Sequence, residues 1–399
     1  MKPQPLKILL FDGTFRTTAF INRLAEGLAQ KNEVLIAGFN ESITQKVPGV
    51  RYSGLGDNTY LLKFIRAGWV LSVKTLFKFG DVAQCFRFVL FLLQRKRKTL
   101  QQENLHKLIR LENPDIIHLQ WVANLPMFEE IIRKKKHTVL LSQRGFHINV
   151  RPFVNEENKA YLQEWFPRLN GFHSVSKAIA AKSNAIWTSE HKKDVVVYSG
   201  LSLDKFPFRE TYQKPSGTLE LLSVGRNHWK KGYKYALIAC KLLKDKGIAF
   251  QYTLLGVQEN EELLYLRQEL GLQEHVQFIA KVPQQEVYER MQKSHLLLLP
   301  SLEEGIANVA IEAMALGLPV ISSRCGGMAE LIDDEVTGWL TDIADPEGMA
   351  RAVLAFVKKQ DNVIAQVRIK ARNKVNEQHT ATRMITEMET LYRQLHETN

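Results

Sequence analysis

The alternation of short apolar segments with amphipathic ones constrains the fold of this chain most strongly. An apolar segment at 7–11 (KILLF) is followed by a polar stretch with Gly13, an amphipathic run at 19–29 and a second apolar segment at 34–39. Strand, helix and strand in this order are typical of a parallel α/β sheet. The same alternation predicts further strands at 115–119, 138–142, 171–175 and 195–198, and a second series at 219–224, 250–255, 276–279, 296–299 and 319–322.

Two such series predict two Rossmann-like, doubly wound domains that face each other across a cleft. The length of 399 residues fits two or three domains. Residues 199–217 contain Gly, Pro and Ser and lack periodicity, which predicts an interdomain linker. We therefore expect a first domain at 1–200, a hinge at 201–217 and a second domain at 218–380. A last helix, at about 381–399, should pack back on the first domain.

The positive charge lies in the first half of the chain. The net charge is +12, and residues 1–200 hold 30 basic and 16 acidic residues against 24 and 26 in the remainder. Residues 61–110 hold 11 basic and two acidic residues among many large apolar ones. Basic and apolar residues at helical spacing are typical of a helix that lies on an anionic leaflet. A core helix with a solvated basic face fits the same pattern.

Composition excludes several classes of protein. Every window of about 18 residues carries charge, so we expect no membrane-spanning helix. The three cysteines lie far apart, which excludes a disulfide framework and a zinc spacing and favours a reducing compartment. The pI of about 9.4 would suit a nucleic-acid binder, but the sequence has no RNP segment, zinc-finger spacing or basic zipper. We expect a cytoplasmic protein without a nucleic-acid partner, peripheral on the inner face of the cytoplasmic membrane if the basic helix is interfacial.

Residues 300–320 (PSLEEGIANVAIEAMALGLPV) form the most informative motif. An expected strand ends at Pro300, a polar loop with Gly305 follows, and a helix begins near Asn308. Ligands bind at the carboxyl ends of parallel strands, and a helix N-terminus there suits a phosphate. Glu304 in the loop and Glu312 in the helix could hold different hydroxyl groups of one ligand. Both could also be solvated carboxylates that the helix dipole stabilises.

A second motif follows another expected strand. In residues 223–232 (SVGRNHWKKG), Gly225 begins a loop that carries Arg226 and Lys231. Two cations so placed can neutralise a diphosphate leaving group.

With these motifs, the chain resembles the retaining glycosyltransferases of family 4, which have the GT-B fold, and in particular bacterial cell-surface polysaccharide transferases. The resemblance rests on VVYSGLSLDKF, SVGRNHWKKG, PSLEEGIANVAIEAMALGLPVI and SSRCGGMAELIDDEVTGWL, and is strongest over residues 195–340. It implies a hexosyltransferase that uses a UDP-sugar or GDP-sugar donor and needs no cofactor and no metal.

The resemblance also implies roles for individual residues of the second domain, with Arg226, Lys231 and Glu304 as its candidate catalytic residues. Arg226 and Lys231 match the pair that holds the donor diphosphate. Glu304 matches the residue that contacts the donor sugar, and Glu312 the residue that binds the ribose. The remaining donor-binding candidates are Gly225, the backbone of Gly305, Ile306, Ala307 and Asn308, and Val282 in the segment 278–283 that would hold the base.

The first domain resembles the family less closely. Its first loop, DGTFRTT, has Gly13 where many members have paired glycines, so Gly13 is the donor-side candidate there. The segment SQRGFHINVRP resembles an acceptor-side segment, which makes Arg144, His147 and Arg151 acceptor candidates. His118 ends an expected strand where several relatives place a histidine near the reacting centre, and it could equally be a structural histidine.

These features predict transfer of a sugar to a glycan or lipid-linked acceptor as the cleft closes. The acceptor proton would pass to a leaving phosphate oxygen on the same face. Three alternatives remain: transfer to a small soluble acceptor, a non-catalytic nucleotide-sugar binder, and another enzyme of the same architecture, such as an epimerase or a phosphorylase.

Overall fold

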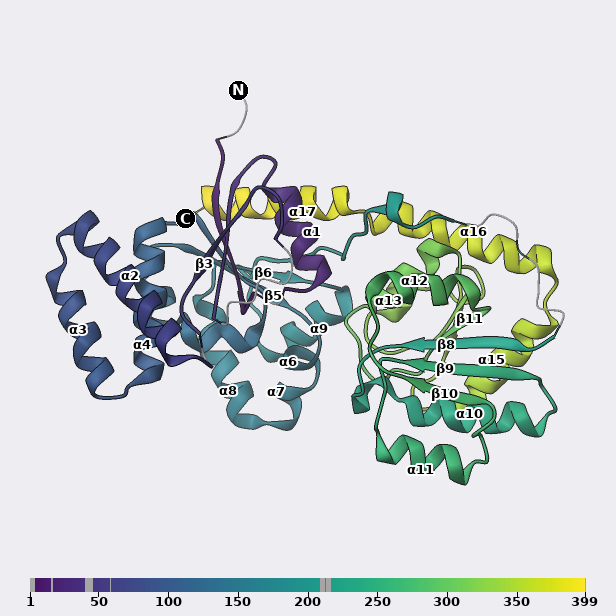
Figure 1. Cartoon of the computed structure of the whole chain (residues 1–399). Coiled ribbons are helices and arrows are strands. Elements are labelled where there is room, and N and C mark those ends of the chain that lie inside the picture. Colours follow the sequence, from purple (N-terminus) through teal and green to yellow (C-terminus); the bar gives the residue numbers. More distant parts are fainter. Residues whose placement is uncertain are drawn as a thin grey trace. The chain divides into compact units, whose positions relative to one another are not determined.

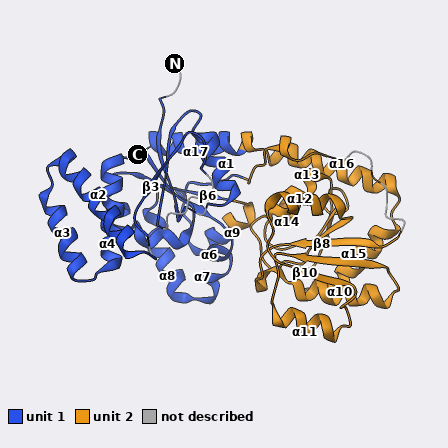
Figure 2. Cartoon of the chain, in the orientation of Figure 1, with its two compact units in different colours: residues 1–174, 182–197, 384–399 blue, residues 175–181, 198–383 orange. Residues whose placement is uncertain are grey.

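The structure is a computed structural model that describes residues 4–15, 17–39, 46–57, 59–208, 212 and 217–398. The chain forms two compact units (Figure 2). Unit 1 comprises residues 1–174, 182–197 and 384–399, and unit 2 comprises residues 175–181 and 198–383. Each unit contains one parallel sheet with helices around it (Figure 1).

The sheet of unit 1 has seven strands in the order β3-β2-β1-β4-β5-β6-β7. Their bounds are β1 (Lys7–Gly13), β2 (Glu33–Gly38), β3 (Val50–Gly54), β4 (Ile116–Leu119), β5 (Thr138–Gln143), β6 (Gly171–Ser174) and β7 (Asp194–Val196). Sequence patterning predicts all of them except β3. That strand pairs only with β2 at the sheet edge and its residues are half-buried or exposed, so it lacks an apolar run. Apart from residues 61–112 and α17, which are described below, the helices of unit 1 are α1 (Ala19–Leu28), α5 (Glu129–Lys134), α6 (Phe146–Asn149), α7 (Arg151–Val154), α8 (Glu156–Trp165) and part of α9 (Lys177–Ile186).

Helix α17 (Ala381–Glu397) belongs to unit 1 from Met384 onward and contributes to its core. Met384, Met388, Leu391 and Leu395 recur every three or four residues and are buried in one cluster with strand residues such as Ile8. A Cβ atom at Gly27 would lie 2.0 Å from Ile385, and one at Gly171 would lie 2.8 Å from Leu395. The absence of these side chains lets α17 pack closely.

Residues 61–112 form three helices instead of the single interfacial helix that the charge pattern suggested. They are α2 (Leu61–Phe79), α3 (Val82–Leu93) and α4 (Arg97–Glu112). Gly80 ends α2 in the left-handed conformation at φ +67°, and Asp81 caps α3 by accepting from the amide of Gln84. The chain therefore reverses after α2, which a count of basic and apolar residues does not reveal.

The sheet of unit 2 has six strands in the order β10-β9-β8-β11-β12-β13. Their bounds are β8 (Leu219–Val224), β9 (Phe250–Leu255), β10 (Val276–Ile279), β11 (Leu296–Leu299), β12 (Val320–Ser323) and β13 (Trp339–Thr341). The helices are α10 (Tyr233–Asp245), α11 (Glu261–Glu269), α12 (Gln284–Lys293), α13 (Asn308–Leu316), α14 (Met328–Leu331), α15 (Pro346–Lys358) and α16 (Asp361–Gln378).

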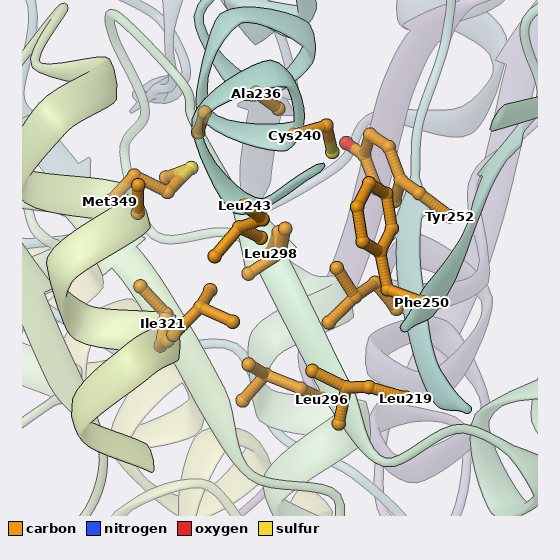
Figure 3. Packing of buried hydrophobic residues seen from close by; sticks show 14 of the residues in the cluster. Leu219, Ala236, Cys240, Leu243, Phe250, Tyr252, Leu296, Leu298, Ile321 and Met349 are labelled. Carbon is orange, nitrogen blue, oxygen red and sulfur yellow. The ribbon is translucent and has the colours of Figure 1, made fainter. Parts of the chain in front are cut away.

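The core of unit 2 lies between the sheet and its helices. Figure 3 shows Cys240 of α10 and Met349 of α15 gathered with Leu298 and Tyr252 of the strands. Residues 199–208, which the sequence assigned to a linker, are packed: Leu201 and Phe206 are buried in a second cluster of unit 2, and Leu201 bridges to Thr380. The remainder of the expected linker lies largely outside the described residues.

Candidate functional site

The candidate donor site lies at the point where the strand order of unit 2 reverses. β8 is followed in sequence by β9 and β10 on one side, whereas β11 is followed by β12 and β13 on the other. The loops after β8 and β11 therefore leave the sheet side by side and diverge, which is where open parallel sheets bind ligands. These two loops are SVGRNHWKKG and PSLEEGIA of the sequence analysis.

An ion pair joins the two loops. Lys231 Nζ lies 2.6 Å from Glu304 Oε1, and the side chains are 20% and 15% exposed. Ser301 Oγ donates to the same carboxylate oxygen at 3.2 Å. The geometry brings together two of the predicted catalytic residues in a partly buried position, where charges interact more strongly than in water.

The loops also fit together through their backbones. The amide of Leu302 donates to the carbonyl of Lys230 at 2.6 Å. Gly232 adopts φ +62°, and a Cβ atom there would lie 2.0 Å from the carbonyl oxygen of Pro300. Only glycine fits this conformation and this approach at low cost. Gly225 lies against Lys231, since a Cβ atom on it would be 3.1 Å from Lys231 Cε.

Residues 304–308 contact the segment SSRCGG, which is residues 322–327. The Gly327 amide donates to the Gly305 carbonyl at 2.8 Å, and a Cβ atom at Gly326 would collide with the Glu304 carbonyl at 1.7 Å. The Ala307 amide faces the sulfur of Met328 at 3.5 Å. Beyond Ile306, which packs against the core, α13 begins at Asn308 with no side chain capping its first turn.

Glu312 lies one turn into α13 and faces α12. Its Oε1 is 3.4 Å from both Gln284 Nε2 and the Tyr288 hydroxyl. Val282, just before α12, is partly buried against the hydrophobic cluster of unit 2 that contains Leu201 and Phe206. Arg226 is exposed in the loop after β8. Arg226, Lys230 and Lys231 all lower the pKa of His228, although burial is the largest cause of that shift.

Tyr233 is a residue that the sequence analysis did not single out. It begins α10 directly after Gly232 and is 5% exposed. Its hydroxyl would lie 2.6 Å from a Cβ atom on Gly225 and has no hydrogen-bond partner among the described residues. Burial, and then the nearby Glu304 charge, raise the pKa of this hydroxyl. A tyrosine at a helix start resembles an ordinary core residue, so the pattern gave no signal.

In unit 1, His118 belongs to a buried hydrogen-bond network. Its Nδ1 lies 2.7 Å from the Tyr392 hydroxyl and 3.0 Å from Gln120 Nε2, and its Nε2 lies 2.7 Å from Ser142 Oγ. Ser142 is also 2.8 Å from His173 Nδ1. Because two donors face His118 Nδ1, the ring is neutral with its proton on Nε2, and burial lowers the pKa of both histidines. The catalytic role expected for His118 stays a prediction. The ring is fully buried and both of its nitrogens are hydrogen-bonded, as in a structural histidine.

Arg144 connects this network to the strand ends. Its guanidinium donates to Gln120 Oε1 at 3.3 Å and to Ser142 Oγ at 3.2 Å, and stacks on Phe20 at 4.2 Å. Burial lowers the pKa of Arg144 to about 9. Of the other acceptor candidates, His147 is half-buried beside Phe146 and Arg151 is exposed at the start of α7.

Asp12 is a second residue that sequence reasoning missed. It lies at the end of β1, where the strand order of unit 1 also reverses between β1 and β4. Trp121, just after β4, donates its indole N–H to Asp12 across this point. Burial raises the pKa of Asp12 to about 6, although Trp121 and Arg144 both lower it. Next to it, Gly13 adopts φ +89° and approaches Asn124. The available signal was a carboxylate that directly follows a buried strand.

Comparison with known proteins places the clearest similarity in unit 2. Residues 204–378 match the family model of Glycosyl transferases group 1. The amylovoran biosynthesis glycosyltransferase AmsK of Erwinia amylovora is 32% identical over 280 residues, which are 65% of this chain and 64% of that protein. The putative colanic acid biosynthesis glycosyltransferase WcaL of Escherichia coli K12 is 31% identical over 252 residues, 61% of each chain. The chain thus spans a little under two thirds of the length of these relatives.

Solved structures share the overall fold of this chain. The Anabaena protein HepE, solved in complex with UDP and glucose, superimposes with a TM-score of 0.70 at 16% identity over 97% of this chain and 99% of that one. The predicted fold class is confirmed: each unit is a Rossmann-like domain with a parallel sheet, as in the GT-B fold of the solved structures, and residues 204–378 are similar to the Glycosyl transferases group 1 model.

Proposed function

We propose that this protein is a retaining, metal-independent glycosyltransferase of family 4 that moves a hexose from a nucleotide diphosphate sugar to a glycan or lipid-linked acceptor. The observation that carries the proposal is the Lys231–Glu304 pair, held at 2.6 Å where the strand order of the group 1 domain reverses.

The donor binds to unit 2 in this proposal. Lys231 and Arg226 hold the diphosphate, with the uncapped start of α13 at Asn308 beside them. Glu304 accepts hydrogen bonds from sugar hydroxyls, and Glu312 accepts them from the ribose. The nucleotide of the donor is UDP or GDP. The HepE complex with UDP, on the same fold, supports the first of these.

The chemistry follows from where charge develops. The bond between the anomeric carbon and the diphosphate oxygen breaks, and Lys231 and Arg226 stabilise the departing anion. The acceptor oxygen bonds to the anomeric carbon on the face that the diphosphate leaves, and its proton passes to a leaving phosphate oxygen. Since two cations and a helix N-terminus take the charge of the diphosphate, we expect transfer to continue in the presence of a chelator.

Unit 1 recognises the acceptor in this proposal. The similarity to proteins named for amylovoran and colanic acid biosynthesis supports a cell-surface polysaccharide intermediate as the acceptor. Arg144, anchored by Gln120 and Ser142, offers a positive group with restricted movement. We further propose that the protein is cytoplasmic and works at the inner face of the cytoplasmic membrane.

A donor screen tests the assignment. The purified protein is incubated with UDP-sugars and GDP-sugars, and thermal stabilisation is measured with and without a chelator. Binding of one nucleotide sugar, and its loss in Lys231→Ala, is the expected result. Stabilisation by none of these donors contradicts the proposal.

Product analysis separates the alternatives. Donor binding without transfer to any acceptor, and without any change in the donor sugar, identifies a non-catalytic binder. Transfer only to soluble sugars identifies the soluble-acceptor enzyme, and an altered donor sugar without transfer identifies an epimerase. Retention is read from the anomeric configuration of the product by NMR.

A further inference from the structure

The three-helix region of unit 1 has an unusual concentration of exposed apolar side chains. Of the large apolar side chains that are exposed in the described part of the chain, 12 of 20 lie between Tyr60 and Leu93. Isolated exposed apolar residues are ordinary, but a concentration of them marks an interaction surface.

The exposed residues follow helical periodicity on α3. Val82, Phe86, Val89, Leu90 and Leu93 are 66%, 71%, 42%, 38% and 76% exposed, and their spacing puts them on one face. The opposite face is used for packing. Phe88 is buried against α2, where a Cβ atom on Gly68 would lie 2.3 Å from its ring. Helix α3 therefore already has its internal partners and presents a second apolar face to the surroundings. It lies at the outer edge of unit 1 in Figure 1.

The end of α2, directly before α3, adds further exposed apolar side chains. Phe77 and Phe79 are 86% and 40% exposed on either side of Lys78, just before the turn at Gly80 into α3. Leu62, Trp69 and Val70 form the exposed stripe along the rest of α2. We call the exposed apolar residues of α2 and α3 the α2–α3 surface; they are Leu61, Leu62, Trp69, Val70, Phe77, Phe79, Val82, Phe86, Val89, Leu90 and Leu93.

The charge around this surface is almost entirely positive. Residues 61–98 hold nine basic residues and one acidic residue, Asp81. The basic side chains are exposed, whereas Asp81 is half-buried and paired with Arg110 at 2.5 Å. A second copy of the chain would bring two such surfaces of like charge together, which is unfavourable. An anionic surface with an apolar interior matches both properties.

A cavity beside α3 adds a place for an anionic head group. It has a volume of about 610 Å³ and is lined by Lys78, Arg87, Arg110, Lys134 and Lys136 together with two glutamates, Glu103 and Glu130. Its lining includes Phe79 of the α2–α3 surface. Lys134 pairs with Glu130 and Arg110 pairs with Asp81, so Lys78, Arg87 and Lys136 are the lining cations that are not in these pairs. Within the described residues, no helix is both long and apolar enough to span a bilayer.

We propose that the α2–α3 surface binds an anionic lipid leaflet. α3 lies in the plane of the interface, with Phe86 and Leu93 among the acyl chains, while the exposed run Arg95–Lys98 and the basic cavity contact lipid phosphates. This inference specifies how the protein reaches the membrane in the proposed function, but it depends on no catalytic residue.

Vesicle sedimentation of the whole chain tests the proposal. One set of vesicles is phosphatidylcholine alone, and the other contains about one third phosphatidylglycerol. The expected result is binding to the anionic vesicles that weakens with salt. Phe86→Ser with Leu93→Ser should weaken binding by about tenfold or more. Arg95→Gln with Lys98→Gln should weaken it by about fivefold per residue.

Matched variants in unit 2 control for general effects. Tyr265→Ser removes an exposed apolar side chain from α11, and Lys246→Gln with Lys293→Gln removes two exposed cations. These variants should bind as the unmodified protein does. Unchanged melting temperatures establish that the surface variants are folded.

Three outcomes overturn the proposal. They are equal binding to both kinds of vesicle, no binding to either, and a dimer that dissociates in the Phe86→Ser, Leu93→Ser variant. Donor-induced thermal stabilisation should be unchanged in that variant, so a failure of membrane binding is distinguished from a failure of the glycosyltransferase assignment.

Discussion

Lys231 and Glu304 are 73 residues apart in the chain, yet their charged atoms lie 2.6 Å apart. They meet because each follows a strand that flanks the reversal of strand order in unit 2. The two charges neutralise each other in this pair. Under the proposed function, a nucleotide-sugar donor replaces the pairing, because its diphosphate binds Lys231 and its sugar hydroxyls bind Glu304.

Removal of either residue should impair transfer much more than folding. Lys231→Ala and Glu304→Ala should each lower kcat by roughly 10²–10³, the usual effect of losing one preorganised electrostatic contact. The double variant should lose less than the product of the two, because the residues share one interaction. Steady-state assays measure this, with Lys246→Ala as the control. Near-normal turnover of either single variant would remove the site from consideration.

Gly232 should resist substitution by alanine. Alanine would have to adopt φ +62° and place its Cβ atom 2.0 Å from the Pro300 carbonyl oxygen, so the two loops must separate. We expect a loss of about 1–3 kcal/mol in the free energy of unfolding of unit 2, together with weaker donor binding. Chemical denaturation measures the first quantity. Gly217→Ala is the control, since nothing lies within 4 Å of its Cβ position; equal stabilities of the two variants would contradict the packing described.

Asp12→Asn should stabilise unit 1 at neutral pH. Burial raises the pKa of Asp12 to about 6 from 3.8, so the folded state binds its proton more tightly than the unfolded state does. The contribution of Asp12 to stability is therefore greatest below pH 4 and is lost as the pH rises through 6. The asparagine variant keeps the acceptor for Trp121 and should be more stable at pH 7 by about 1–3 kcal/mol, with no difference near pH 3. A constant difference across this range would show that the carboxylate is not the cause.

Tyr392→Phe should lower the free energy of unfolding of unit 1 by about 1 kcal/mol. The substitution removes the hydroxyl that lies 2.7 Å from His118 Nδ1 and leaves Gln120 as the remaining donor to that nitrogen. The comparison is Tyr265→Phe, whose side chain is 67% exposed. If both variants unfold at the same denaturant concentration, the hydrogen bond contributes nothing measurable.

The strands of unit 2 were predictable because most of them are buried apolar runs with polar or glycine residues at their ends. β8, β9, β10 and β11 begin and end at the predicted residues. β13 was not predicted, since Trp339–Thr341 has three residues and pairs only with β12 at the sheet edge. Similarly, α3 could not be separated from α2 by composition, because Gly80 and Asp81 are the only interruption.

The residues of the candidate sites were likewise predictable only in part. Lys231 and Glu304 each belong to a motif that local spacing identifies, although their pairing depends on strand order. Asp12 gains its properties from Trp121, 109 residues away, and from the burial that the fold imposes. The burial of Tyr233 and His118 likewise depends on tertiary packing, which no local sequence pattern predicts. Motifs therefore identified the two loops of the candidate site, whereas the pKa shifts and ion pairs of unit 1 could be found only from the structure.

The packing of α17 sets an order for folding during synthesis. Unit 2 is made almost entirely of residues 198–383, so its core can close once that stretch has emerged. Most of unit 1 precedes unit 2 in the chain, but its core includes Met388, Leu391 and Leu395, which follow unit 2. Its sheet therefore stays incompletely covered until these residues have been made. A nascent chain that stops after Arg383 would leave unit 2 folded and the earlier unit exposed to proteases.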